Sequence, residues 1–199
     1  MNAFLESLKK RRSQYMLGKD VSLSDEQLEK YIGDIIQTLP SAMNSQSQRA
    51  VLLFGENHDE LWDIVLDALK ALNPDNEVTM ETNTKINGFK NAYATVLFYA
   101  DQDVTDELIR KFPTYKDNFV KWQDHENGIM QLAVWTGLAE ENIGASLQHY
   151  NPLIDEKVRE EFGIPESWKL NAQMPFGNII TPMDENPRDE LSTKFKVFR

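Results

Sequence analysis

Hydrophobic and polar residues follow one another along the chain in two different spacings. Residues 24–39 place leucine and isoleucine at helical intervals after Ser24 and an acidic first turn, and Pro40 ends the run. Residues 50–55 and 94–99 are short and largely apolar, which is typical of strands buried on both faces. The pattern therefore predicts helices and strands within one chain.

The second half of the chain contains a proline-free stretch with apolar residues on broad faces. This stretch, residues 115–142, predicts one long helix or two helices joined near Gly128. Before it, residues 59–72 predict a helix that ends at Asn73 and Pro74. The remaining pattern predicts an extended segment from residues 147–150, a short helix at residues 151–162 and a strand at residues 168–176.

The C-terminal tail, residues 177–199, differs from everything before it. It is rich in charged residues and contains Pro182 and Pro187. Its apolar residues show little helical periodicity. Such a tail has no local surface to pack on, and the long helix is also hard to cover within one small domain. No repeat or linker divides the chain, so we expect a single domain of residues 1–199. Its tail would wrap another surface, and a partner subunit is one candidate.

Composition and charge exclude several classes of function. The chain has 32 acidic and 21 basic residues and a net charge of −11, which disfavours nucleic acid and anionic membranes as partners. It has no cysteine, which excludes disulfides, thiolate metal sites and iron–sulfur clusters. Residues 1–13 lack the apolar centre of a signal peptide, and no window is long enough to span a bilayer. We expect a cytoplasmic protein.

Basic residues gather near the N-terminus of this acidic chain. Lys9 and Lys10 are followed by Arg11, Arg12 and Ser13. Two guanidiniums and a hydroxyl can clamp a phosphate, because a guanidinium matches phosphate oxygens with two parallel hydrogen bonds. Taken alone, the stretch is more typical of a solvated charge run.

Two further segments have the polar groups that a flat ring would need. Residues 40–48 form a polar loop whose amides can both donate to and accept from a ring edge, although an ordinary connecting loop has the same composition. Residues 143–152 combine small residues with polar and aromatic ones, so a ring could lie against the backbone. The three histidines lack metal-site spacing, and we expect no metal. The sequence also lacks a nucleophile elbow, a P-loop and a dinucleotide-binding glycine motif.

Taken in this order, the three segments resemble the nitroreductase family of FMN-dependent oxidoreductases, most closely its short branch of fatty acid repression mutant proteins. The resemblance runs from about Ser7 to the C-terminus. It implies an α+β fold with three α-β-α layers, a mostly antiparallel central sheet and an intertwined homodimer. Two FMN molecules would lie at the interface, and each tail would extend over the other subunit.

The resemblance also implies the roles of individual residues. Arg11, Arg12 and Ser13 would hold the phosphate and ribityl chain, and Arg188 would close the phosphate site. Tyr15 stands beside them where a basic residue is common, and Asn186 stands where a lysine is common. The other subunit would supply the ring contacts Ser41, Asn44 and Gln46. Ser146, Gln148 and His149 would face flavin N5, in place of the Pro-x-Glu-Gly of larger family members.

The leading functional hypothesis is a redox reaction in two steps. NADH or NADPH would give hydride to flavin N5, and a nitroaromatic, quinone or similar planar molecule would then be reduced at the same face. The protein would position the reactants without a catalytic acid or base, so every site residue is a cofactor contact. Two alternatives stay open. One is a flavin-binding redox sensor with little turnover, and the other is a structural protein without flavin.

Overall fold

A central β-sheet organises the molecule, which is described here from a computed structural model covering residues 2–73, 75 and 77–199. The strand order is β1-β5-β3-β2, with β4 also paired to β5, and every strand pairing is antiparallel. The mostly antiparallel sheet that the resemblance implies is thus confirmed. The strands are β1 (Met16–Gly18), β2 (Gln48–Phe54), β3 (Ala94–Asp101), β4 (Ile143–Ala145) and β5 (Trp168–Thr181).

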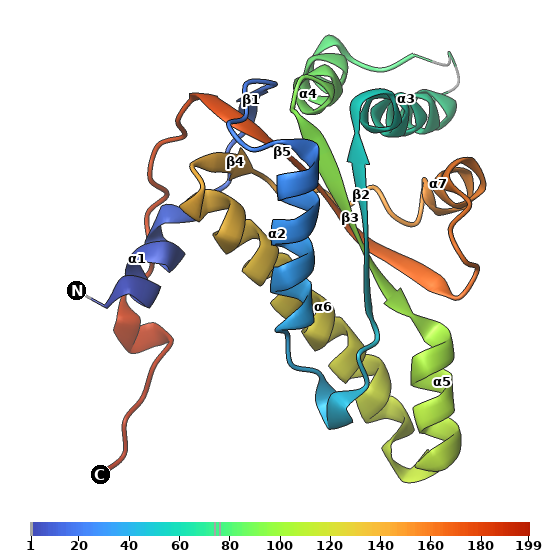
Figure 1. Cartoon of the computed structure of the whole chain (residues 1–199), viewed down its shortest axis with the longest axis vertical. Coiled ribbons are helices and arrows are strands. Elements are labelled where there is room, and N and C mark those ends of the chain that lie inside the picture. The colour runs from blue at the N-terminus through green and yellow to red at the C-terminus, as the bar shows by residue number, and fades with distance from the viewer. Residues whose placement is uncertain (1, 74, 76) are drawn as a thin grey trace.

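Strand β3 divides the core into two halves, because its side chains alternate between the faces of the sheet. Ala94, Val96 and Phe98 pack with helices α2 and α6, whereas Leu97 and Tyr99 pack with α3, α4 and α7. Figure 1 shows these two groups of helices on opposite sides of the strands. The three-layer α-β-α fold is therefore confirmed. The helices are α2 (Asp25–Gln37), α3 (Gly55–Ala71), α4 (Met80–Lys90), α6 (Lys116–Glu140) and α7 (Asp155–Phe162).

Helix α2 begins where the sequence pattern predicts. The Ser24 side chain accepts a hydrogen bond from the Gln27 N–H, and the Gln27 side chain accepts the Ser24 N–H, which forms a capping box. Leu28 and Ile32 are buried at helical spacing against the sheet. Local sequence therefore determines both the start and the orientation of this helix.

Helix α6 is one continuous helix that passes through Gly128. Met130, Val134 and Leu138 form its buried stripe against the sheet. On another face Ile129 and Leu132 are 42% and 47% exposed. The long apolar helix is therefore only partly covered by its own chain, as its breadth predicts.

Several predicted boundaries were wrong. Helix α3 starts at Gly55 rather than residue 59, because Gly55 adopts a left-handed φ of 53° and turns the chain directly from β2 into the helix. Helix α7 starts at Asp155 rather than residue 151. Strand β5 continues past Phe176 to Thr181 because β1 and β4 pair with its last residues, so the tail begins at Pro182. Pro74, which the sequence suggested as the end of α3, lies outside the described residues.

Two helices and one strand are among the elements that escaped the sequence pattern. Helix α4 buries only Ile86 and Phe89, and helix α5 (Gln102–Lys111) buries only Thr105, so neither has a broad apolar stripe. Strand β1 has three residues, too few for a period to be visible. These elements are held mainly by contacts with distant parts of the chain.

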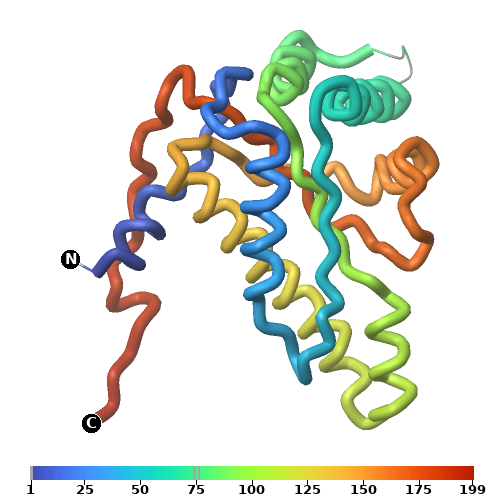
Figure 2. The backbone as a smooth tube through the Cα atoms, viewed as in Figure 1, coloured from blue at the N-terminus to red at the C-terminus, as the bar shows by residue number. Residues whose placement is uncertain are grey.

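The two chain ends lie on the same side of the molecule. Helix α1 (Ala3–Lys10) contacts α6, and the C-terminal segment runs past α1 before it projects away from the sheet (Figure 2). Residues 182–199 are exposed throughout and contain one turn of 3-10 helix, η3 (Leu191–Thr193). No helix among the described residues is long and apolar enough to cross a membrane.

A buried histidine links α3 to β3. His58 is fully buried, with its Nδ1 2.9 Å from the Thr95 hydroxyl and its Nε2 3.1 Å from the Lys90 carbonyl. Because the carbonyl can only accept, Nε2 carries the proton and Nδ1 accepts from Thr95, whose oxygen also accepts the Trp62 indole N–H. Burial lowers the pKa of His58 from its ordinary 6.5, although the Lys90 carbonyl opposes this shift.

We predict that His58 makes stability fall in weak acid. Its folded-state pKa is depressed, so its contribution is complete above the ordinary pKa of 6.5 and is lost below it, because the unfolded chain takes up the proton first. Urea unfolding between about pH 8 and pH 5 would measure this loss. His58→Gln keeps a donor and an acceptor without titrating, and it should flatten the pH dependence. Identical pH dependence in both proteins would contradict the prediction.

Candidate functional site

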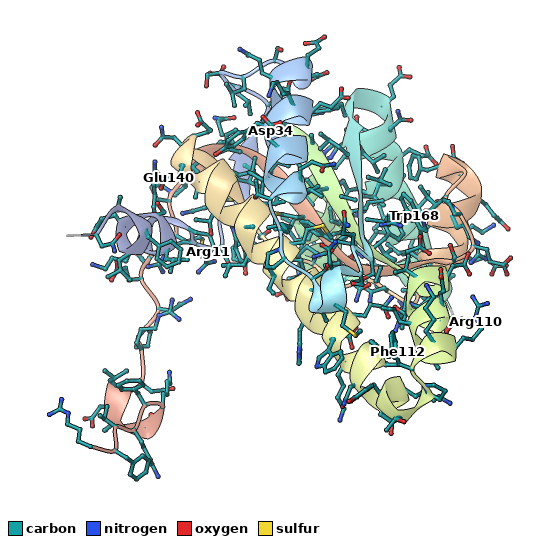
Figure 3. The ribbon with its side chains drawn as sticks, turned by 60° about the horizontal axis from the view of Figure 1, so that its bottom comes forward. Arg11, Asp34, Arg110, Phe112, Glu140 and Trp168 are labelled. Atoms are coloured by element: carbon teal, nitrogen blue, oxygen red, sulfur yellow. The ribbon has the colours of Figure 1, made fainter. Side chains whose placement is uncertain are left out.

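Three guanidiniums meet where α1 ends beside the C-terminal half of α6. Figure 3 labels Arg11 at the end of α1. Its guanidinium lies over the Trp135 ring, 4.3 Å from the ring centroid. Burial lowers the pKa of Arg11, and the positive charges of Arg188 and Arg12 lower it further. This spot is therefore locally positive in a chain with a net charge of −11, and a bound anion would relieve the repulsion.

A cavity of about 530 Å³ opens at this cluster. Arg12 donates to the Asp184 carbonyl at 2.6 Å and forms a 3.5 Å ion pair with Glu185, whose side chain is 93% exposed. Such an exposed pair is weak, so a phosphate could displace the Glu185 carboxylate. Arg11, Arg12 and Arg188, all expected at one phosphate site, are thus brought together. The cavity is lined by Leu5, Leu8, Lys9, Arg11, Arg12, Glu185, Asn186 and Arg188.

The residues after Arg12 join this cavity to the edge of the sheet. Ser13 forms a parallel bridge with Ala145, and the Gln14 N–H donates to the Ala145 carbonyl at 2.9 Å. The buried Gln14 side chain accepts the Met183 N–H at 2.9 Å and so ties the start of the tail to the sheet. Sequence reasoning missed Gln14, because nothing local distinguishes it. The expected contact Tyr15 is 41% exposed.

The segment after β4 leaves two backbone donors free. The N–H groups of Ser146 and Gln148 donate to the Pro175 and Gln173 carbonyls, at 3.3 and 2.7 Å. The Gln148 side chain is buried and donates to the Ser146 hydroxyl at 3.1 Å. Within the described chain, the N–H groups of Leu147 and His149 have no acceptor. They can therefore donate to a polar ring edge, whereas the side chains of Ser146 and Gln148 are already engaged.

A fully buried glutamine supports this segment from β5. Gln173 exchanges both backbone hydrogen bonds with Gln148. Its side-chain oxygen accepts the Tyr150 N–H at 2.8 Å, and its amide nitrogen donates to Asn151 at 3.3 Å. Sequence reasoning missed Gln173. Its only signal was a polar residue at a buried position of a predicted strand.

The polar loop of residues 40–48 lies elsewhere on the molecule. The Ser41 hydroxyl accepts the Gln46 N–H at 2.9 Å, inside the loop. The side chains of Asn44 and Gln46 are exposed and help to line a cavity of about 220 Å³ that also includes Arg49. This cavity has no residue in common with the guanidinium cavity.

Helix α6 sets the distance between the polar loop of residues 40–48 and the cavity at the three arginines. The loop is bonded to Glu126 on α6, and Arg11 stacks on Trp135 of the same helix. Glu126 and Trp135 lie about 13.5 Å apart along the helix axis, at a rise of about 1.5 Å per residue. One chain therefore brings the arginines close to residues 146–149 but leaves Ser41, Asn44 and Gln46 away from them.

Comparison with known proteins gives consistent matches over nearly the whole chain. A model described as the nitroreductase family matches residues 8–178. The chain is 33% identical over 184 residues to HBN1 of Saccharomyces cerevisiae, covering 92% of this chain and 91% of HBN1.

Solved structures have the same fold. The nitroreductase CinD from Lactococcus lactis, in complex with chloramphenicol, has a TM-score of 0.91 and 41% identity over 99% of this chain and 100% of its own. CinD was also solved with nicotinic acid and with 4-nitrophenol. A nitroreductase with bound FMN from Desulfitobacterium hafniense has a TM-score of 0.73 and 18% identity, with both chains fully covered, which shows the fold alone.

We predict that Gln173→Ala loosens the segment of residues 146–151. It leaves the Tyr150 N–H without its acceptor, and we expect a loss of about 1–3 kcal/mol in unfolding free energy. Urea denaturation would measure this loss, and amide exchange should become faster at Tyr150. Lys169→Ala, at an exposed position of the same strand, is the matched control. Equal stability of the two variants would contradict the assigned role.

Proposed function

The chain belongs to the nitroreductase family, and we propose that it is an FMN-dependent oxidoreductase that uses NADH or NADPH to reduce planar oxidised molecules. The expected acceptors are nitroaromatics, quinones and similar compounds. The complexes of CinD support this substrate class. 4-Nitrophenol is a nitroaromatic, and nicotinic acid has the same pyridine ring as a nicotinamide.

The observation that carries the cofactor proposal is the cluster of Arg11, Arg12 and Arg188 around one cavity. Such a cluster suits a phosphate dianion, because each guanidinium can give two parallel hydrogen bonds. The free N–H groups of Leu147 and His149, close by through the Ser13–Ala145 bridge, would donate to the polar edge of the ring. When bound, FMN would supply the hydride chemistry, and the protein would bind and orient it.

We propose that the site is completed in a homodimer. Within one chain, the arginines and the loop carrying Ser41, Asn44 and Gln46 do not form one pocket. The exposed Ile129 and Leu132 of α6 offer an apolar surface for a second copy. The projecting tail would pack on that copy through Leu191, Phe195, Val197 and Phe198, all more than half exposed in the isolated chain. The loop of the partner subunit would then reach the ring.

One observation favours the redox-sensor alternative. Larger family members are expected to carry a glutamate where this chain has Gln148, and the Gln148 amide is buried and bonded to Ser146. A neutral, internally bonded side chain offers no charge to a nicotinamide. This alternative therefore predicts a flavoprotein whose flavin is reduced only slowly by NADH or NADPH.

The cofactor proposal is tested by visible absorption and by anaerobic addition of NADH or NADPH. We expect flavin bands that bleach and then return when a nitroaromatic is added. Arg11→Ala and Arg188→Ala should each weaken FMN binding roughly tenfold or more, because each removes charge-assisted hydrogen bonds to phosphate. Arg110→Ala, in the last turn of α5 and far from Arg11 (Figure 3), is the control. Bands that persist support the sensor, and absence of bands after FMN addition would overturn both flavin proposals.

The dimer proposal is tested by sedimentation velocity. Ile129→Glu combined with Leu132→Glu puts two charges on the exposed face of α6, and burying them in an interface would be unfavourable. We expect a monomer that has lost most of its FMN affinity. Leu72→Glu, at a 65% exposed position after α3, should remain dimeric. A dimer in both cases would rule out this face as the interface.

A further inference from the structure

A buried carboxylate on α6 holds the loop between α2 and β2. Glu126 is only 4% exposed. One of its oxygens accepts the Ala42 N–H at 2.7 Å, and the other accepts the Ser47 hydroxyl at 2.8 Å. The Ser45 hydroxyl lies 3.2 and 3.0 Å from the two oxygens. All three donors belong to residues 40–48, the loop expected to reach the flavin.

These donors are the main compensation for burying the Glu126 charge. Burial of an ionised carboxylate destabilises a protein unless hydrogen bonds or an opposite charge offset the lost hydration. In the part of the chain that the structure describes, no Lys, Arg or His forms an ion pair with Glu126. A buried anion bonded mainly to one loop indicates a role in that loop.

The loop conformation requires support from outside. Met43, Asn44 and Gln46 have φ values of 52°, 56° and 52°, in the left-handed region. Residues with a side chain rarely adopt this region, and they persist in it only where neighbouring groups hold them. Glu126 holds the backbone at Ala42 and the side chain of Ser45, the residues that flank Met43 and Asn44. The Arg49 guanidinium holds the next turn by donating to the Gln46 carbonyl at 2.7 Å.

We propose that Glu126 is a positioning residue for the cofactor, an inference that rests on the function proposed above. Through Ala42, Ser45 and Ser47 it presets the left-handed turn, so that the side chains of Asn44 and Gln46 stay exposed and available to a flavin ring. A preset loop loses less conformational entropy when a ligand binds, so affinity rises without any contact between Glu126 and the ligand.

The test is a set of four variants measured in the full-length protein. Glu126→Ala removes the acceptors, and Ser45→Ala removes one donor from the loop while leaving the carboxylate in place. Glu126→Gln is the conservative rescue, because its oxygen can still accept the Ala42 N–H while its amide donates to the serine oxygens. Asp124→Ala, at an exposed position on the same helix, is the matched control.

Three readouts separate positioning from general stabilisation. They are the FMN Kd by fluorescence titration, the visible circular dichroism of bound flavin, and amide exchange without flavin. For Glu126→Ala we expect a Kd raised roughly tenfold or more and a changed dichroism spectrum. Amide exchange should become faster at Ala42, Asn44, Ser45 and Gln46 but not in β3. Ser45→Ala should change the same readouts less, and Glu126→Gln should stay near wild type.

Several outcomes would overturn the proposal. Unchanged loop exchange in Glu126→Ala would show that the carboxylate does not hold the loop. Faster exchange with an unchanged FMN Kd would show that the loop does not position the cofactor. Faster exchange throughout β3, with Ser45→Ala silent, would make Glu126 a general stabiliser. If the wild type binds no FMN, the proposed function fails, while loop exchange still decides whether Glu126 holds the loop.

Discussion

The burial of β3 on both faces is the constraint on which the rest of the structure depends. All eight of its residues, Ala94–Asp101, are buried, so each face of the sheet must be covered by helices. Helices α2 and α6 cover one face, and α3, α4 and α7 cover the other. The two edges of β3 are occupied by β2 and β5. Because β5 also pairs with β1 and β4 near its C-terminal end, it brings the basic N-terminal segment and residues 143–149 to the same end of the sheet.

Helix α6 connects the core to every part of the candidate site. One face packs on the sheet through Met130 and Val134. Trp135 lies under Arg11, and Glu126 accepts the hydrogen bonds of the polar loop. Two of its exposed apolar residues, Ile129 and Leu132, are those proposed to meet a second subunit. A single rigid helix can therefore place the phosphate end and the loop at a constant separation, which a two-subunit site needs.

The negative net charge of the chain is the reason why the cluster of Arg11, Arg12 and Arg188 indicates an anion-binding site. A net charge of −11 makes a cluster of three guanidiniums unusual, and burial together with mutual repulsion lowers the pKa of Arg11. The tail contributes Arg188 to the cluster, and Gln14 and Arg12 hold the start of the tail in place. The proposed phosphate site would thus be built from both ends of the chain, and its assembly would depend on the path of the tail.

The sequence by itself determined the elements whose signals are local. The capping residues and apolar spacing of α2, the apolar runs of β2 and β3, and the ordered motifs around Arg11, Ser41 and Gln148 are all readable from neighbouring residues. Tertiary structure decided the rest. Helices α4 and α5 have too few buried residues to show a period, and Gly55 starts α3 through its backbone angle. Gln14, Glu126 and Gln173 act through hydrogen bonds to residues far away in sequence, so only the folded chain shows their partners.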